Sequence, residues 1–361
     1  MELYGYFLSL VRLGIGNPVQ TISKPVCWSG IQSLADKQGL YAIVLDGIEK
    51  LPKELRPPQE TLLEWIGEVF QGYEYRFKEY KKTIGNLSQF LNNHGFRIMV
   101  LKGYACSLNW PNPNHRPCGD IDIWLFGKQK EVDAILAKEK GIGIDDSHEH
   151  HTVFYWHDFM VENHYDFIDV HHRKSSSELE KIFKELGKDD THYVELKDAS
   201  TGSSTKVYLP SPNLHALFLL RHCMEHFAST ELTIRQLLDW AFFVEKHTKE
   251  IDWNWLLGVL DEFGMTPAFK IFNAICVEDL GFDAGLFPQV QYDPFLKERV
   301  LNDIMNPEFV EKSPKSFLLR LFFKYRRWKA NGWKHELCFK ESMWSAFWSG
   351  VWGHLLKPSS I

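Results

Sequence analysis

Two aspartates, Asp120 and Asp122, stand inside the short apolar segment 119–125. Apolar residues alternate with them, which is the pattern of a β-strand, and side chains two positions apart on a strand share one face. Two carboxylates held side by side repel each other unless a cation or a base lies between them. The segment therefore predicts a sheet in this chain, and on one face of that sheet a site for a hard divalent cation.

The spacing of apolar residues changes twice along the chain. Residues 1–95 follow a helical period, most clearly between Leu62 and Leu91. Residues 96–210 contain short apolar runs typical of buried strands, and residues 211–361 return to the helical period. We therefore expect an α+β protein in three parts, in which an α/β core is flanked by an N-terminal and a C-terminal helical region.

Individual elements follow from these patterns, with Gly and Pro marking many of their ends. In the core, the expected strands are 97–101, 120–126, 150–156, 165–172 and 206–209, with helices at 104–109 and 129–140 and a hairpin turn at 157–159. Outside the core, the expected helices are 29–39, 41–51, 62–91, 232–247, 253–263, 266–280 and 293–305, and another begins near Leu214.

The composition is that of a soluble globular protein, with 44% apolar and 24% charged residues. A net charge of -6 gives no overall attraction to nucleic acid. The six cysteines show no zinc-binding spacing, so we interpret them as free thiols in a reducing compartment. No signal peptide and no apolar run of about 18 residues is present, so the expected location is the cytoplasm.

A third acid lies in a setting like that of the first two. Asp169 is flanked by apolar residues in a predicted strand, and His171 follows it. Asp166 is the competing candidate, but the alternation of a strand places it on the face opposite Asp169. We therefore predict that Asp169 joins the aspartate pair.

These residues and their order resemble the polymerase-beta-type nucleotidyltransferase superfamily, and most closely a large bacterial family called uncharacterised nucleotidyltransferases. The matching core residues are Leu101, Lys102, Gly103, Trp110, Pro111, Pro113, Arg116, Gly119, Asp120, Asp122, Asp169 and His171. The matching residues outside the core are Trp28, Gln38, Arg221, His222, His226, Arg235, Asp239, Trp240, Asp252 and Trp253. The resemblance covers most of residues 25–285 and implies a minimal nucleotidyltransferase core with a mixed sheet.

The resemblance implies a two-Mg²⁺ enzyme that transfers a nucleoside monophosphate, AMP from ATP in the first instance, to a hydroxyl of an unknown small molecule or protein. Asp120 and Asp122 would bind both metals, and Asp169 would complete the catalytic metal and help to deprotonate the acceptor. The residues implied to bind the nucleotide are Lys102, Gly103, Arg116, Gly119 and His171.

One departure from the superfamily pattern leaves a second interpretation open. A Gly-Ser or Gly-Gly pair usually follows the first strand, whereas this chain has Lys102, Gly103 and Tyr104 there. Lys102 could supply charge to the phosphates instead. The alternative is a binding or scaffolding protein that keeps the fold and has weak activity or none.

Several polar pairs keep more than one interpretation. The histidines in 148–151 could bind zinc, line the site or lie at a solvated strand edge. His222 and His226 are four apart on a predicted helix, which indicates packing or contact with substrate more than metal binding. Arg235 and Asp239 have the same spacing, typical of an ion pair on a helix surface.

The C-terminal segment combines basic and aromatic residues. Residues 324–329 alternate these two types, and apolar residues from Trp344 to Leu355 share one helical face. This face could pack on the protein itself, dock on a membrane or a partner, or bind a polynucleotide.

Overall fold

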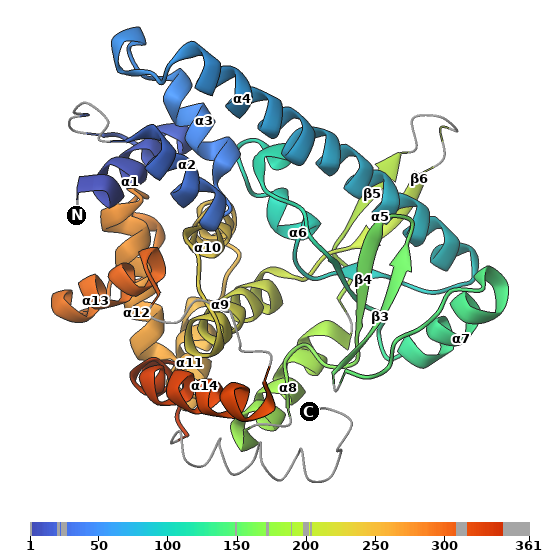
Figure 1. Cartoon of the computed structure of the whole chain (residues 1–361). Helices are drawn as coiled ribbons and strands as arrows, with labels where there is room; N and C mark the ends of the chain where they lie inside the picture. Colours follow the sequence, from blue (N-terminus) through green and yellow to red (C-terminus); the bar gives the residue numbers. More distant parts are fainter. Residues whose placement is uncertain are drawn as a thin grey trace.

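The computed structural model describes residues 2–19, 22, 27–148, 150–170, 173–188, 190–197, 202, 204–307 and 316–341. It shows a mixed sheet on one side of the molecule and a large group of helices on the other (Figure 1). This is the α+β architecture that the sequence predicts. Within the described part of the chain, no helix is long and apolar enough to cross a membrane.

The bounds of the elements are as follows. The strands are β1 (Met99–Val100), β2 (Ile121–Trp124), β3 (His151–Trp156), β4 (Phe159–His164), β5 (Tyr193–Lys197) and β6 (Ser204–Tyr208). The helices of the first half are α1 (Glu2–Ile15), α2 (Trp28–Lys37), α3 (Tyr41–Glu49), α4 (Gln59–Val69), α5 (Arg76–Asn93), α6 (Tyr104–Ser107) and α7 (Gln129–Lys140). The later helices are α8 (Lys174–Lys188), α9 (Pro212–Ser229), α10 (Ile234–His247), α11 (Trp253–Glu262), α12 (Thr266–Ala274), α13 (Pro294–Met305), α14 (Phe317–Ala330) and α15 (Gly332–Cys338).

The six strands form one sheet in the order β3-β4-β2-β1-β6-β5. Strand β2 pairs with β4 in parallel and with β1 in antiparallel orientation, so it lies in the middle of the sheet. Residues Asp122 and Glu162 are directly paired in the β2–β4 register. Because paired residues of adjacent strands point to the same face, the topology alone places these two carboxylates side by side.

The two faces of the sheet are covered by different parts of the chain. Ile121 and Ile123 of β2 pack with α5 and α7 in one buried cluster. Trp124 points the other way and packs with residues of α8 and α9 in a second, larger cluster. Asp122 alternates with the isoleucines, so it lies on the face that is turned toward the C-terminal helices.

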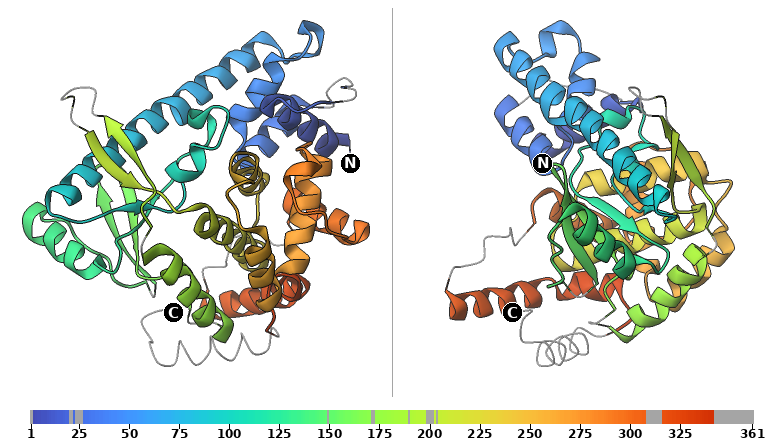
Figure 2. Two further views of the ribbon diagram at one scale, coloured as in Figure 1. Left: turned by 180° about the vertical axis from the view of Figure 1, so that it is seen from behind. Right: turned by 90° about the vertical axis from the view of Figure 1, so that its right-hand side faces the viewer.

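The N-terminal and C-terminal helices share this larger cluster. Gln38, just after α2, donates a hydrogen bond to the carbonyl of Ile304 and accepts one from the backbone of Ile234 at the start of α10. Helices α4 and α5 are joined by a π-helical segment, Phe70–Tyr75, and together they run from the N-terminal helices to the sheet (Figure 2). The boundaries 1–95, 96–210 and 211–361 remain a prediction.

Most of the predicted elements are confirmed, but one strand is wrong. We expected the strand after the hairpin turn to be 165–172. The strand after the turn is instead β4, and the described residues 165–170 are not in a strand. A turn of two residues, His157 and Asp158, pairs Trp156 with Phe159 and so brings the nearer apolar segment into the sheet. Helix α8 and strand β5 were not predicted, and the aromatic face from Trp344 to Leu355 lies outside the described residues.

Glycine is required where α1 crosses α3. A Cβ atom at Gly47 would lie 2.1 Å from the carbonyl oxygen of Leu10. We therefore expect Gly47→Ala to lower the free energy of unfolding by about 1–3 kcal/mol through overpacking, as measured by urea denaturation. The control is Gly67→Ala on α4, where no atom lies within 4 Å and a gain of about 0.5–1 kcal/mol is expected. Equal effects of the two changes would contradict this account of the crossing.

Candidate active site

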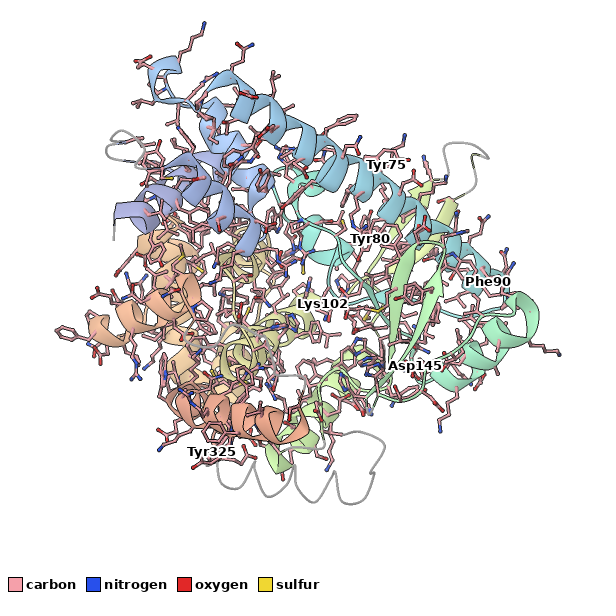
Figure 3. All side chains as sticks on the ribbon, viewed as in Figure 1. Tyr75, Tyr80, Phe90, Lys102, Asp145 and Tyr325 are labelled. Carbon is pink, nitrogen blue, oxygen red and sulfur yellow. The ribbon has the colours of Figure 1, made fainter. Side chains whose placement is uncertain are left out.

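Asp122 is the most deeply buried acid of the site, with 2% of its surface exposed. Its Oδ1 atom lies 2.6 Å from Nζ of Lys102, which follows β1, and 3.1 Å from Nε2 of His164 at the end of β4. A buried carboxylate needs such partners, because desolvation penalises an uncompensated charge. Figure 3 shows Lys102 on the side of the sheet that faces the helices.

The turn at Lys102 and Gly103 is fixed by a tyrosine from α5. Gly103 has φ = 54°, and a Cβ atom there would lie 2.1 Å from the hydroxyl of Tyr80. That hydroxyl donates a hydrogen bond of 2.8 Å to the backbone carbonyl of Asp120. Only glycine fits both the conformation and the space, so the turn and the aspartate strand are held together by Tyr80.

Strand β4 brings a third carboxylate to the aspartate pair, that of Glu162. Nε2 of His164 lies 3.3 Å from Oε2 of Glu162 and so contacts both Glu162 and Asp122. One ligand atom from each of Asp122, Glu162 and His164 can be chosen so that all three lie within 4.8 Å of one another. Carboxylate oxygens supplemented by one imidazole form a donor set that suits a divalent cation.

The protonation states follow from these contacts. Burial would raise the pKa of Asp122, but the charge of Lys102 and the hydrogen bond of His164 outweigh it and hold that pKa well below its usual value. Burial, and then the charge of Asp122, raises the pKa of Asp120. Burial would lower the pKa of Lys102, but the two aspartates outweigh it and raise that pKa. The centre of the site is therefore a charged cluster at neutral pH.

The structure places Asp169 differently from the predicted strand. It follows β4 in a segment without strand structure and is half-buried. Its charge raises the pKa of His150, although burial and His164 lower that pKa overall. Glu162 takes the position beside Asp122 that was predicted for Asp169, and His171 lies outside the described residues.

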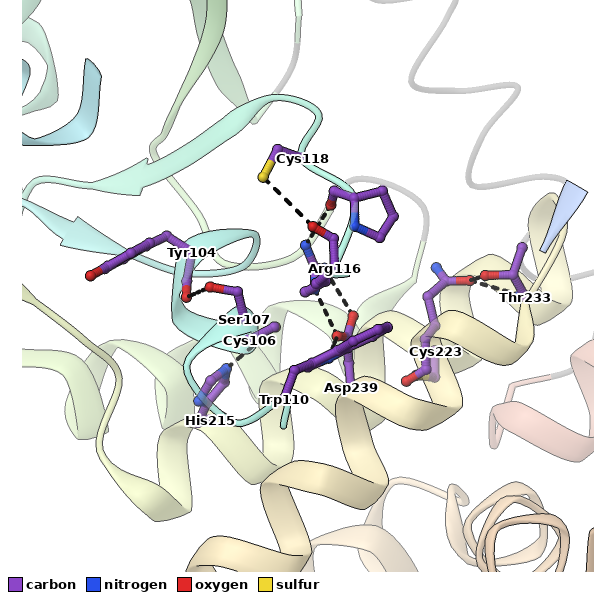
Figure 4. A network of polar contacts seen from close by, with 12 residues as sticks. Tyr104, Cys106, Ser107, Trp110, Arg116, Cys118, His215, Cys223, Thr233 and Asp239 are labelled. Carbon is purple, nitrogen blue, oxygen red and sulfur yellow. Dashed lines mark hydrogen bonds and ion pairs between the residues drawn. The ribbon is translucent and has the colours of Figure 1, made fainter. Parts of the chain in front are cut away.

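Arg116 contacts an acid of the helical region and not the aspartate pair. Its Nε lies 2.7 Å from Oδ1 of Asp239 and its second terminal nitrogen 2.9 Å from Oδ2, a bidentate pair that is buried on both sides. The indole of Trp110 donates a further hydrogen bond of 2.8 Å to Oδ1 (Figure 4). The predicted surface ion pair of Asp239 with Arg235 is therefore wrong. Gly119 is exposed in the loop that leads to β2.

Two histidines of α9 face the site from the helical side. The rings of His222 and His226 are 4.4 Å apart. Burial, and then the charge of Lys102, lowers the pKa of His226 to about 4, and the same two causes hold the pKa of His222 well below its usual value. Both imidazoles are therefore neutral at neutral pH and add no charge to the site.

A second group of histidines surrounds His164. One nitrogen each of His150, His151 and His164 can be chosen so that all three lie within 4.8 Å of one another. The ring of His148 stacks on His151 with 4.6 Å between centroids. Burial lowers the pKa of His151 to about 4. The predicted histidine segment therefore lines the edge of the acid site, and its use of zinc remains a prediction.

The sheet with paired acids on one face, set between helices, defines a protein of the nucleotidyltransferase-like α+β class. More specifically, residues 24–280 match the profile of a family described as "Uncharacterised nucleotidyltransferase", and the chain belongs to that family. This match confirms the family resemblance that the sequence motifs predicted.

Two solved structures are distantly similar to the chain. An antigenic nucleotidyltransferase-like protein from Paracoccidioides brasiliensis has 13% identity and a TM-score of 0.36, over 58% of this chain and 97% of its own. A tRNA nucleotidyltransferase in complex with a primer tRNA and an incoming ATP analogue has 14% identity and a TM-score of 0.22, over 75% of this chain and 90% of its own. No curated protein sequence matches the chain. The family assignment therefore depends on the profile match.

The buried Arg116–Asp239 pair gives a stability prediction. Arg116→Met leaves the Asp239 carboxylate buried without a cation, so we expect the free energy of unfolding to fall by about 3–5 kcal/mol in urea denaturation. The control is Lys128→Met, which removes an exposed ion pair of 2.7 Å with Glu131 and should cost about 0–1 kcal/mol. The double variant Arg116→Met/Asp239→Leu should recover part of the loss. Equal losses of stability for Arg116→Met and Lys128→Met would contradict a stabilising role of the buried Arg116–Asp239 pair.

Proposed function

We propose that the site transfers a nucleotidyl group from a nucleoside triphosphate, with ATP as the first candidate, to a hydroxyl of an acceptor. The observation that carries this proposal is the pairing of Asp122 on β2 with Glu162 on β4, with Asp120 immediately before β2, in a chain that belongs to a nucleotidyltransferase family. The two aspartates enter the proposal as the sequence predicted them. Glu162 replaces Asp169 as the third acid.

The three acids would hold divalent cations, with Mg²⁺ as the first candidate because all of their donor atoms are hard oxygens. When bound, the cations would neutralise the triphosphate and stabilise the attacking and leaving oxygens. The donor set fits this use, because Asp122, Glu162 and His164 converge within 4.8 Å. His164 and Lys102 keep the Asp122 carboxylate ionised and oriented, which a metal ligand requires.

The role of Gly103 follows from its conformation. The close approach of Tyr80 leaves no room for a side chain there, so the backbone of the turn is held against the aspartate strand. We propose that this fixed turn lets the phosphates lie close to the backbone beside Lys102. Helix α6, which follows, has only four residues, so its dipole adds little to this contact.

A second candidate function is a binding or scaffolding protein that keeps the fold without catalysis. The observation that favours it is the ammonium group of Lys102, which lies 2.6 Å from Oδ1 of Asp122 and already neutralises this carboxylate. In this case the lysine would neutralise the acids permanently. Binding of nucleotide that does not depend on magnesium would support this second candidate.

The proposed ligand set is tested by isothermal titration of the native chain with each of the four ribonucleoside triphosphates, with and without Mg²⁺. We expect magnesium-dependent binding of at least one triphosphate. Glu162→Gln should weaken that binding by at least about 10-fold, because it removes a charged metal ligand. Asp120→Asn should have a similar effect.

The matched control for Glu162→Gln is Asp169→Asn, the equivalent change at the acid that the sequence predicted. We expect it to change the affinity by less than about 2-fold, a difference well below 1 kcal/mol. A larger loss of affinity for Asp169→Asn than for Glu162→Gln would indicate that Asp169, and not Glu162, is the third metal ligand. Absence of magnesium-dependent binding in the native chain would contradict the proposed function itself.

A further inference from the structure

Arg235 is a half-buried cation on the helical side of the site. It stands on the first turn of α10, and its Nε atom is buried with no hydrogen-bond partner among the residues that the structure describes. In the same part of the chain, no ion pair joins its guanidinium to an acid. A buried donor without a partner carries a desolvation cost, so the Nε atom of Arg235 is a group that a ligand oxygen can satisfy.

The nearest acid on its own helix is already in use. Asp239 lies one turn after Arg235, which is the usual spacing of an ion pair. However, both oxygens of Asp239 bind Arg116, and one of them also accepts the hydrogen bond of Trp110. Asp239 would therefore be a suitable partner for Arg235, but it is already paired with Arg116.

The side chain of Arg235 packs against the N-terminal side of the molecule. A Cβ atom at Gly39 would lie 3.2 Å from Cδ of Arg235 and 3.6 Å from Pro117. The arginine stem therefore lies against the glycine after α2 and the loop that leads to β2. Because Gly39 has φ = 65°, a larger residue is disfavoured there for both its conformation and its contacts.

The guanidinium is close to the acid site. Burial and the neighbouring charge of Arg116 lower the pKa of Arg235, and the charges of Asp239 and, more weakly, Asp120 oppose this. Burial first, and then the charges of Lys102 and Arg235, lower the pKa of His226, so both cations act on one imidazole from different parts of the chain. Arg235 thus approaches the site from the helical side, whereas Lys102 and the acids belong to the sheet.

The other cations of the site are occupied. Lys102 is bound to Asp122, Arg116 is bound to Asp239, and the imidazoles of His222 and His226 are neutral at neutral pH. Among these described cations, Arg235 is the one left with charge and donors to offer. A guanidinium fork matches the oxygens of a phosphate in a bidentate contact, and it does so better than an ammonium group.

We propose that Arg235 binds a phosphate group of the substrate, most directly the triphosphate of the nucleotide, from the side of the helical region. This inference rests on the proposed function for the identity of the donor. The phosphate would act as a counter-ion for Arg235, which forms no ion pair among the described residues. The contact would also place the triphosphate between α10 and the acids of β2 and β4.

The test is isothermal titration of the full chain with three probes in the presence of Mg²⁺: ATP, tripolyphosphate and adenosine. Arg235→Gln should weaken ATP and tripolyphosphate by about 10- to 100-fold, since it removes charged hydrogen bonds to phosphate. Adenosine binding should not change. Arg235→Lys keeps the charge but loses the fork, so it should recover only part of the affinity.

A stability measurement separates phosphate binding from a structural role. Removal of a half-buried charge that forms no ion pair should leave the urea midpoint of Arg235→Gln unchanged or raise it, whereas loss of a structural contact would lower it. The control variant is Arg299→Gln, whose arginine on α13 stacks 3.9 Å above the ring of Trp333, far along the chain from the acids. It should bind ATP and tripolyphosphate as the native chain does.

The outcomes distinguish this inference from the proposed function. Native-like binding of both phosphate probes by Arg235→Gln overturns the inference and leaves the nucleotidyltransferase proposal in place. A native chain that binds tripolyphosphate through Arg235 but binds no nucleoside triphosphate keeps the phosphate site and rejects the nucleotide donor. A native chain that binds neither probe overturns both.

Discussion

The buried contact between Arg116 and Asp239 determines how the two halves of the site meet. Arg116 belongs to the loop that leads into β2, and Asp239 belongs to α10, so this bidentate pair joins the sheet to the helical region (Figure 4). Both side chains are almost fully buried, and the indole of Trp110 completes the hydrogen bonds of the carboxylate. The pair therefore fixes the strand that carries Asp122 relative to the helix that carries Arg235.

The two sides of the site differ in charge, and this difference indicates the kind of ligand that the site could bind. On the sheet side, three acids share one lysine and one histidine, so negative charge remains that a cation can neutralise. On the helical side, Arg235 forms no ion pair with an acid among the described residues. Excess negative charge next to an unpaired arginine suits a ligand that brings both signs, and a metal-bound triphosphate is such a ligand.

The sequence was sufficient for the periodic elements and for the strand that carries Asp122, because the alternation of a strand is visible in the local residues. It was not sufficient for the third acid. Glu162 and Asp169 each follow an apolar residue and each precede a histidine by two positions, so the local pattern was the same at both. Only the short turn before β4 decides which copy enters the sheet, and turn geometry is weakly encoded in the residues His157 and Asp158. The pairing of Arg116 with an acid more than a hundred residues later had no local signal either.

The same long-range dependence explains why the helical regions on both sides of the core share one hydrophobic cluster. The acids come from the core, but Tyr80 of α5 holds the turn at Gly103, and Gly39 after α2 packs against Arg235 of α10. Each contact joins residues that are far apart in the sequence and that must keep fixed distances. Packing the first and last helices into one core supplies that rigidity, because closely packed interiors transmit position better than flexible linkers do. The proposed site therefore depends on residues from all three sequence regions, and the sheet alone would lack Arg235.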